Sequence, residues 1–389
     1  MAGPGPSRGM TPDFDPRAAR RAIRLVFLAN AITFATWAPL VPLMRDRLVL
    51  SEAMLGLVLL SLGLGGILAM PLTGGLVARF GSRAVSLVAG LAFALVLPFL
   101  AMAPNAGVLA GTVFLFGAAG GMMDVSMNAQ AVAVEARGSR PVMSSIHGVW
   151  SLGGLLGVAV AAGLLRAGLP PSAAAALIAA VALVLLMTQG RALLGPEADR
   201  PGKGGHGFAL PRGPVLGIGL LALVAFLAEG SVLDWGGILL HEARGMALTL
   251  AGSGYAAFSL AMAAARLSGD AMTRRFGATA MLRGGGALAA LGFAMASLLP
   301  WSGTTMAGFL LVGFGLGNAV PLLISAAGRQ PGVAPGTALA AVATLGYSGL
   351  LAGPAAIGFA AEIIGLEAAL AGVGALMLLL VARAGLARG

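Results

Sequence analysis

The second half of this 389-residue chain repeats features of the first half at a constant distance along the sequence. Three separate segments keep the same register. In each pair the second member follows the first by 196 residues: Arg79-Phe80-Gly81 and Arg275-Phe276-Gly277, Gly117/Gly121 and Gly313/Gly317, Gly153/Gly157 and Gly349/Gly353. A chain that repeats itself over half its length is expected to fold into two similar bundles that face each other.

The composition decides which solvent these bundles meet. Charged residues make up 10% of the chain and hydrophobic residues 58%, whereas a soluble domain carries roughly 25% charge. Such a chain has too few charges to cover its surface in water, so most of it is expected to face lipid. Twin apolar halves are typical of secondary transporters, in which the substrate site lies between the repeats.

A helix needs about 20 apolar residues to cross a bilayer. Twelve stretches meet this length: 22–44, 52–77, 84–103, 107–133, 143–166, 172–194, 213–240, 247–272, 278–299, 303–327, 336–361 and 366–386. The predicted fold is therefore an all-α membrane protein with 12 transmembrane helices in two six-helix repeats. The first stretch has no small-residue cleavage site, so it is interpreted as a retained helix rather than a signal peptide.

The polar segments divide the chain. Residues 1–16 are rich in Pro and Gly and are predicted to be a disordered tail. The longest polar stretch, residues 195–212, falls between the repeats and is predicted to be a cytoplasmic linker. This leaves an N-terminal six-helix bundle at 17–194 and a C-terminal six-helix bundle at 213–389.

The basic residues predict the orientation. Of the 24 Lys and Arg residues, nineteen lie in the two terminal segments and the even-to-odd loops, and Arg45, Arg47, Arg166 and Arg244 lie in the other loops. Cytoplasmic loops carry the excess of Lys and Arg, so both termini are expected in the cytoplasm. The high Ala, Gly and Arg content indicates a bacterial cytoplasmic (inner) membrane. The net charge of +10 is spread over short clusters, which argues against nucleic-acid binding.

The reactive residue types exclude several classes of site. The chain has no Cys and three scattered His, which leaves no metal site. No nucleophile and base form a catalytic constellation, so we expect no enzyme and no cofactor.

Two loop segments resemble a family signature. Residues 74–83, Gly-Gly-Leu-Val-Ala-Arg-Phe-Gly-Ser-Arg, resemble the loop that joins helices two and three in the major facilitator superfamily, except that Ala78 replaces the usual Asp. The second copy, residues 266–277, carries Asp270 one turn earlier. The resemblance implies the major facilitator fold and residues that stabilise one facing of a carrier. The gating or conformational candidates are Arg79, Gly81, Arg83, His147, Arg266, Asp270 and Arg275.

Other segments are similar to the fucose/galactose/hexose permease-like branch of that superfamily and its bacterial relatives: residues 124–130, 145–153 and 229–235. In those permeases an acid four residues before an Asn in helix four is implicated in proton coupling, and Asp124 and Asn128 match these positions. The permeases also use an acid in helix one, where this chain has Asn30 and no carboxylate.

An ionisable group inside a membrane helix is a functional hypothesis by default. Asp124 lies well inside the fourth span, and helical spacing places Asn128 and Glu135 on the same stripe. Burial favours the protonated form of a carboxylic acid, so such a group can exchange a proton near neutral pH. The proton-coupling candidates are Asp124, Glu229 and Glu135. The alternatives are an interhelical hydrogen bond for Asp124 and Glu229, and an ion pair with Arg137 or Arg140 for Glu135.

Polar residues at helical spacing mark candidate substrate contacts. The substrate-cavity candidates are Asn30, Thr33, Trp37, Asn128, Tyr255, Ser259 and Asn318. Polar groups beside an aromatic wall suit a small polar solute, and interhelical packing is the alternative for each of them. His147 opens the fifth span, which favours a gate near the cytoplasmic face. Arg266 and Asp270 are four residues apart and are expected to pair within their helix.

Together these features predict a monomeric secondary transporter whose partners are a small-molecule substrate, protons and the lipid bilayer. The leading hypothesis is proton-coupled uptake of a small polar, sugar-like solute by alternating access. A proton-driven exporter of drugs or metabolites is the alternative within the same class. A non-transporting membrane receptor or scaffold is the alternative from a different class.

Overall fold

The computed structural model describes residues 15–138, 140–198, 212–247, 250 and 252–387. Nearly all of the predicted tail, 1–16, and most of the predicted linker, 195–212, lie outside these residues. Within them the regular structure is helical and no strand occurs. The long helices are α1 (Pro16–Arg47), α2 (Glu52–Phe80), α3 (Ser82–Met102), α4 (Ala106–Arg137), α5 (Met143–Arg166), α6 (Pro171–Gln189), α7 (Gly213–Ile238), α9 (Ser253–Phe276), α10 (Ala278–Leu298), α11 (Ser302–Leu316), α12 (Ala319–Gly328), α13 (Pro335–Ile364) and α14 (Leu366–Arg383).

The predicted spans reappear as helices. In the described part of the chain, 11 segments are long and apolar enough to cross a membrane, one of them formed by α11 and α12 together. The predicted eighth span, now α9, is not in this set; it carries four charged side chains, two of them at its end. The other two, Arg266 and Asp270, are 5% and 8% exposed. Protein rather than lipid surrounds them, which is how charges are tolerated inside a membrane.

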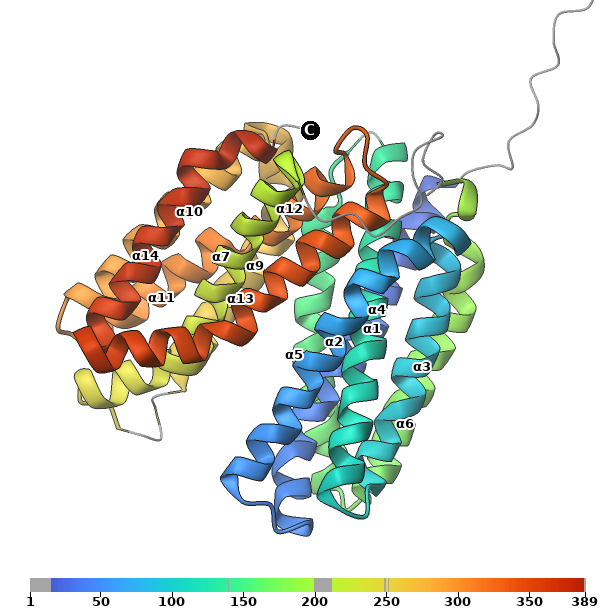
Figure 1. Ribbon diagram of the computed structural model, residues 1–389, viewed down its shortest axis with the longest axis horizontal. Helices are drawn as coiled ribbons and strands as arrows, with labels where there is room; N and C mark the ends of the chain where they lie inside the picture. Colours follow the sequence, from blue (N-terminus) through green and yellow to red (C-terminus); the bar gives the residue numbers. More distant parts are fainter. Residues whose placement is uncertain (1–14, 139, 199–211, 248–249, 251, 388–389) are drawn as a thin grey trace, which may run out of the picture.

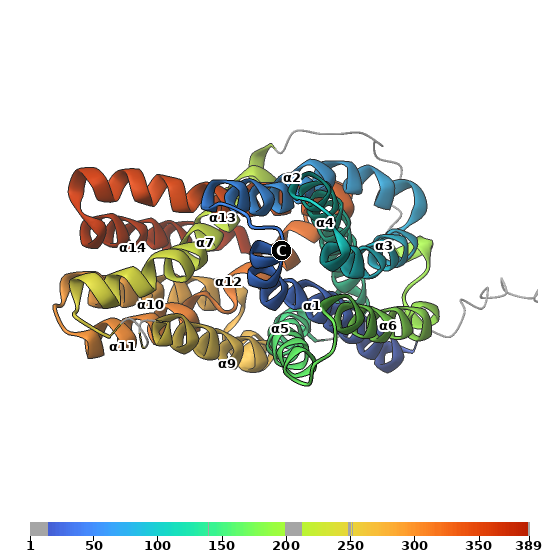
Figure 2. The ribbon, with the colours of Figure 1, turned by 90° about the horizontal axis from the view of Figure 1, so that it is seen from below.

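The helices form two six-helix repeats that lie side by side (Figures 1 and 2). α1–α6 make up one half, and α7 with α9–α14 makes up the other, in which α11 and α12 together form one span. We call the end where α1 begins and α14 ends the terminus side, and the opposite end the far side. The halves converge at the terminus side and diverge toward the far side (Figure 1). The most extensive contacts between them join α2 to α13 and α5 to α9.

The sequence repeat corresponds to a repeat in packing. A Cβ atom added at Gly117 would lie 2.0 Å from the carbonyl oxygen of Leu62, and one added at Gly313 would lie 2.2 Å from that of Phe258. Leu62 and Phe258 are themselves 196 residues apart. α4 therefore approaches α2 as α11 approaches α9, at points where only glycine leaves room.

The connection between α2 and α3 is repeated as well. Gly81 has φ 84° at the junction of α2 and α3, and Gly277 has φ 80° at the junction of α9 and α10. Glycine adopts positive φ without steric cost. The repeated Arg-Phe-Gly motif therefore forms the same tight turn in both halves.

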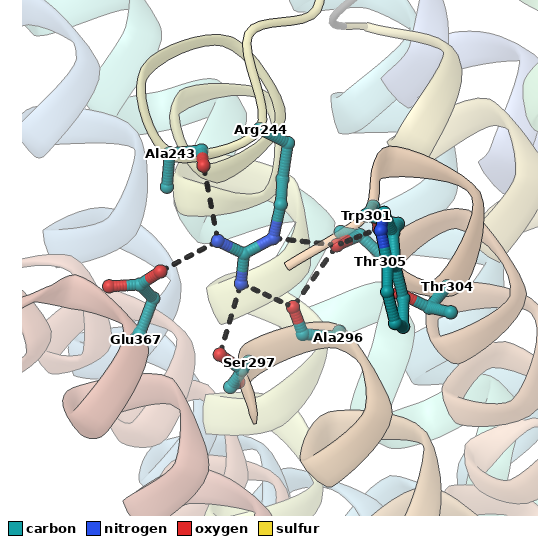
Figure 3. Close-up of polar contacts among 8 residues, drawn as sticks. All are labelled: Ala243, Arg244, Ala296, Ser297, Trp301, Thr304, Thr305 and Glu367. Atoms are coloured by element: carbon teal, nitrogen blue, oxygen red, sulfur yellow. Dashed lines mark hydrogen bonds and ion pairs between the residues drawn. The ribbon is translucent and has the colours of Figure 1, made fainter. Parts of the chain in front are cut away.

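Arg244, which follows the π-helical end of α7, joins the far-side ends of several helices in the second half (Figure 3). Its side chain is 3% exposed and its Nη1 lies 2.6 Å from Oε1 of Glu367. Its Nη2 donates to the carbonyl oxygens of Ala296 and Ser297 at 3.1 and 3.0 Å, and its Nε donates to Oγ1 of Thr305 at 3.2 Å. One side chain thereby connects α7 to α10, α11 and α14.

Candidate functional site

A cavity of about 260 Å³ lies between the two halves. Residues from α1–α5 line it on one side, and residues from α7, α9, α12 and α13 line it on the other. Most of its wall is apolar, and its aromatic members are Phe27, Phe34, Phe93, Phe116, Trp150, Phe226 and Tyr347. Its strongly polar members are Asn30, Asp124, His147, Glu229 and Arg266. A few polar groups in an apolar wall are typical of a small-molecule site.

Asp124 begins a chain of polar contacts in the first half. Nδ2 of Asn128, one helical turn later on α4, donates to the backbone oxygen of Asp124 at 2.8 Å and to its Oδ1 at 3.3 Å. Oδ1 of Asn128 lies 3.2 Å from Nε2 of His147 on α5. An amide oxygen only accepts, so the ring must carry its proton on Nε2. No ion pair joins Asp124 to a base within the described residues.

Glu229 and Arg266 face the cavity from the second half. Oε2 of Glu229 on α7 lies 4.0 Å from Nη2 of Arg266 on α9. The guanidinium also donates from Nη1 to Oγ of Ser151 on α5, at 2.7 Å. Ser151 belongs to the first half, so Arg266 connects the two halves beside the cavity.

The break between α11 and α12 supplies another acceptor for Arg266. Its Nε donates to the carbonyl oxygen of Gly317 at 3.1 Å. In an unbroken helix that oxygen would accept from the residue four positions later, but Pro321 has no N–H. The free carbonyl is therefore available to the guanidinium.

The expected pair between Arg266 and Asp270 is replaced by contacts between the halves. Arg266 faces Glu229, as described above. Asp270 lies one turn nearer the terminus side, where Oδ1 accepts from the backbone N of Ser144 at 3.0 Å and Oδ2 from that of Ser145 at 3.1 Å. The spacing of four residues allows a pair within the helix. Here each side chain instead meets a partner on another helix.

Glu135 lies in the terminus-side contact and not in the cavity wall. Its Oε2 accepts from the backbone N of Val142 at 2.9 Å and from that of Met143 at 3.0 Å. Its Oε1 accepts from Oγ of Ser325 on α12 and pairs at 3.1 Å with Nη1 of Arg329, the residue that follows α12. The partner of Glu135 is thus a base of the other half, and not the neighbouring Arg137 or Arg140 considered from the sequence.

Together, Asp270 and Glu135 satisfy the first backbone donors of α5. The initial N–H groups of a helix have no acceptor within the helix, and the helix dipole favours negative charge at this end. Glu135 belongs to the same half as α5, whereas Asp270 belongs to the other. The contact of Asp270 with the start of α5 therefore holds the halves together at the terminus side.

Most of the substrate-cavity candidates do not line the cavity. Of the predicted substrate-cavity set only Asn30 lines it, where its Oδ1 accepts from Nε1 of Trp150 at 2.8 Å. Thr33 donates to the carbonyl of Ala29 in its own helix at 2.7 Å. The other candidates that do not line the cavity are Trp37, Asn128, Tyr255, Ser259 and Asn318.

The gating candidates are divided between the cavity and the terminus side. His147 lies in the cavity wall. Arg79 and Arg275 each lie over the ring of the next residue, at 5.0 and 5.3 Å from its centroid. Gly81 forms the turn before α3, and Arg83 lies on the outer side of α3.

Sequence reasoning missed two features of this region. The aromatic wall includes Trp150, Phe226 and Tyr347; Trp150 is three residues from His147, a helical spacing that could have placed it on the same face. Gln130, fully buried, donates from Nε2 to Oγ of Ser82 and to the carbonyl of Leu194, both at 3.1 Å. No local pattern predicts that second contact, because it joins residues 64 positions apart.

Comparison with known proteins places this geometry in context. The profile of the Major Facilitator Superfamily matches residues 24–354. An uncharacterised MFS-type transporter of Yersinia pestis is 44% identical over 359 residues, which cover 92% of this chain and 93% of the relative. An uncharacterised transporter of Sinorhizobium fredii is 35% identical over 91% of this chain and 96% of the relative.

Solved structures share the fold at low sequence identity. The fucose:proton symporter of E. coli superimposes with a TM-score of 0.79 at 12% identity, over 95% of this chain and 98% of that chain. A proton:xylose symporter superimposes with a TM-score of 0.75 at 15% identity, over 94% of each chain. At these identities the likeness extends to the fold alone.

Proposed function

This chain belongs to the major facilitator superfamily, and we propose that it is a proton-coupled transporter that takes up a small polar organic solute. The observation that carries the proposal is the position of Asp124. Its carboxyl group lies in the wall of the central cavity, half-buried, with an amide neighbour and no ion-pair partner in the described part of the chain. An acid of this kind can change its protonation state without breaking an ion pair.

The other two acids are suited to different tasks. Glu229 already faces the guanidinium of Arg266, so its protonation would leave that buried base without its counter-charge. Glu135 belongs to the contact that closes the terminus side. Asp124 is therefore the proton carrier in this proposal, and Glu229 keeps the second half of the cavity electrically balanced.

The terminus side faces the cytoplasm in this proposal, because the Lys and Arg residues are concentrated there. Contacts of Asp270 and Glu135 close that side, whereas the halves diverge on the far side (Figure 1). The described conformation is then the outward-facing one. Transport would require the bundles of residues 17–194 and 213–389 to rock about the cavity, as a monomer in a bacterial inner membrane.

The size of the cavity favours a compact solute. Pockets for drug-sized ligands usually enclose about 300–1,000 Å³, and this one encloses about 260 Å³. The side-chain amide N–H groups of Asn30 and the ring faces of Trp150 and His147 are of the kind that suit a monosaccharide. The two symporters that share the fold carry fucose and xylose with protons, which supports a sugar-like substrate class.

One observation favours export of amphipathic compounds as a second candidate. Seven aromatic side chains contribute to a mostly apolar wall. Such a wall binds flat or hydrophobic molecules without requiring many hydrogen bonds.

A ligand screen separates the two candidates. Purified carrier is heated with a panel of monosaccharides and, in parallel, with a panel of amphipathic amines and acids, because a ligand that binds only the folded state raises the melting temperature. Stabilisation by a sugar supports the proposal if the Trp150→Ala variant loses it. Stabilisation by the amphipathic panel alone would contradict the sugar-like class.

A further inference from the structure

A second hollow, separate from the central cavity, lies between α3 and α6 in the first half. It encloses about 150 Å³ and is lined by Arg83, Leu87, Leu91, Leu186, Met187, Gly190 and Arg191. A Cβ atom at Gly190 would lie 2.9 Å from Cδ1 of Leu87, so glycine permits the end of α6 to approach α3 this closely. We call this hollow the α3–α6 groove.

The groove has a polar end and an apolar end. Arg83 is the second residue of α3, and Arg191 follows the end of α6 by two positions, so both lie at the terminus side. Leu91 is eight residues further along α3, which is about 12 Å deeper into the bilayer at 1.5 Å per residue. Met187 is 71% exposed, so the apolar part opens toward lipid and not toward the protein interior.

The two arginines have no partner in the described residues. Neither guanidinium makes a hydrogen bond or an ion pair there, and no acidic side chain lines the groove. Arg83 is half-buried and Arg191 is exposed. Two unpaired positive charges beside an apolar slot, at the depth of a membrane interface, make a site complementary to a negatively charged amphiphile.

We propose that the α3–α6 groove binds one anionic phospholipid from the terminus-side leaflet. Its phosphodiester lies between the guanidinium groups of Arg83 and Arg191, and the first part of an acyl chain follows Leu87, Leu91 and Met187. Arginine matches a phosphate with paired N–H donors, and basic pockets between membrane helices hold acidic head groups. Free phosphate would use only the polar end, whereas the apolar end requires a lipid.

The test measures lipid retention by native mass spectrometry. The full-length carrier in detergent is titrated with phosphatidylglycerol and, separately, with phosphatidylcholine of the same acyl chains. We expect the wild type to retain phosphatidylglycerol preferentially. Replacing one arginine near a charged membrane surface weakens binding about 5-fold, so the Arg83→Gln/Arg191→Gln variant should bind about 25-fold more weakly.

Two further variants serve as controls. Arg274→Gln/Arg283→Gln removes the same charge from two exposed terminus-side positions of the other half and should retain phosphatidylglycerol as the wild type does. Arg83→Lys/Arg191→Lys keeps the charge without the paired donors, so its affinity should be intermediate. If the glutamine variant of the groove cannot be purified, the weaker phosphatidylglycerol binding of this lysine variant tests the proposal in its place.

Three results would overturn the proposal. The groove variants could retain phosphatidylglycerol as well as the wild type does, or both glutamine variants could lose it equally, which would indicate a general charge effect. Inorganic phosphate at millimolar concentration could displace the lipid completely, which would assign the site to soluble phosphate.

Discussion

Arg47, at the end of α1, binds the carbonyl end of α3 as Arg244 binds the carbonyl end of α10. Arg47 donates to the carbonyl oxygen of Ala101, and Arg244 donates to that of Ser297, 196 residues later. The last carbonyls of a helix lack donors within the helix and carry partial negative charge, so a guanidinium there is stabilising. Binding of helix ends therefore explains why Arg47 and Arg244, two of the four basic residues in the far-side loops, lie on the side with few basic residues.

Replacing Arg244 should destabilise the carrier. Arg244→Gln removes the donors that hold Ala296, Ser297 and Thr305, and a buried acceptor left unpaired costs about 1–3 kcal/mol. We therefore expect the free energy of unfolding to fall by about 2–4 kcal/mol, measured by intrinsic tryptophan fluorescence during thermal unfolding. Arg166→Gln, at an exposed far-side arginine, is the matched control. Equal melting temperatures for the two variants would contradict the claim that the contacts of Arg244 stabilise the fold.

Asp270 should control the population of the closed terminus side. Asp270→Asn removes the charge at the start of α5, an interaction of about 1 kcal/mol that reaches about 2 kcal/mol when partly buried. The equilibrium should then shift about 5- to 30-fold toward opening at that side.

The absence of Cys makes this shift measurable, because Ala84→Cys and Ala280→Cys introduce unique spin-label sites. Both are exposed terminus-side positions, one in each half. Pulsed electron–electron double resonance should detect a new, longer distance between the two spin labels in the Asp270→Asn variant. Glu362→Gln, at an exposed carboxylate, should keep the wild-type distribution. An unchanged distribution in the Asp270 variant would mean that the contact does not hold the halves together.

Gly74 and Gly75 offer a matched pair for the other contact between the halves. A Cβ atom at Gly74 would lie 3.1 Å from the carbonyl oxygen of Gly336 and from Cα of Thr337, whereas one at Gly75 would meet nothing within 4 Å. The longer side chain of Gly74→Leu should therefore push α2 away from α13 and lengthen the distance between the same spin labels. Gly75→Leu should leave that distance unchanged. Identical behaviour of the two variants would refute the steric account.

Glu229 and Arg266 should be energetically coupled. Glu229→Gln leaves a buried guanidinium without its counter-charge, at a cost of about 1–3 kcal/mol. Removing both charges with Glu229→Gln/Arg266→Gln should cost less than the sum of the single variants, with a coupling of at least about 0.5 kcal/mol. Thermal unfolding of the four proteins gives this number. Strict additivity would show that the 4.0 Å approach is not an interaction.

The sequence predicted the fold well because its signals are local. Apolar length fixes where a helix crosses a membrane, and Gly117 and Gly313 recur because the same close approach occurs twice. The eighth predicted stretch also forms a helix, α9, although Arg266 and Asp270 lie within it.

The partners of these charges could not be predicted in the same way. Asp270 meets Ser144, which lies 126 residues away on the other half, and helical periodicity carries no information about that distance. Thr33 illustrates the same limit. Helical spacing makes Asn30 and Thr33 equal candidates, but the helices packed against α1 decide that only Asn30 lines the cavity. Contacts between the halves depend on how the two bundles dock.

The most direct test of the account measures proton movement through Asp124. Proteoliposomes containing the carrier and a trapped pH-sensitive dye are exposed to each monosaccharide of the panel. We expect a sugar that stabilises the wild type to acidify the lumen, and we expect Asp124→Asn to bind the same sugar without acidification. Acidification by Asp124→Asn at the wild-type rate, or none with any sugar in the wild type, would contradict proton coupling at this residue.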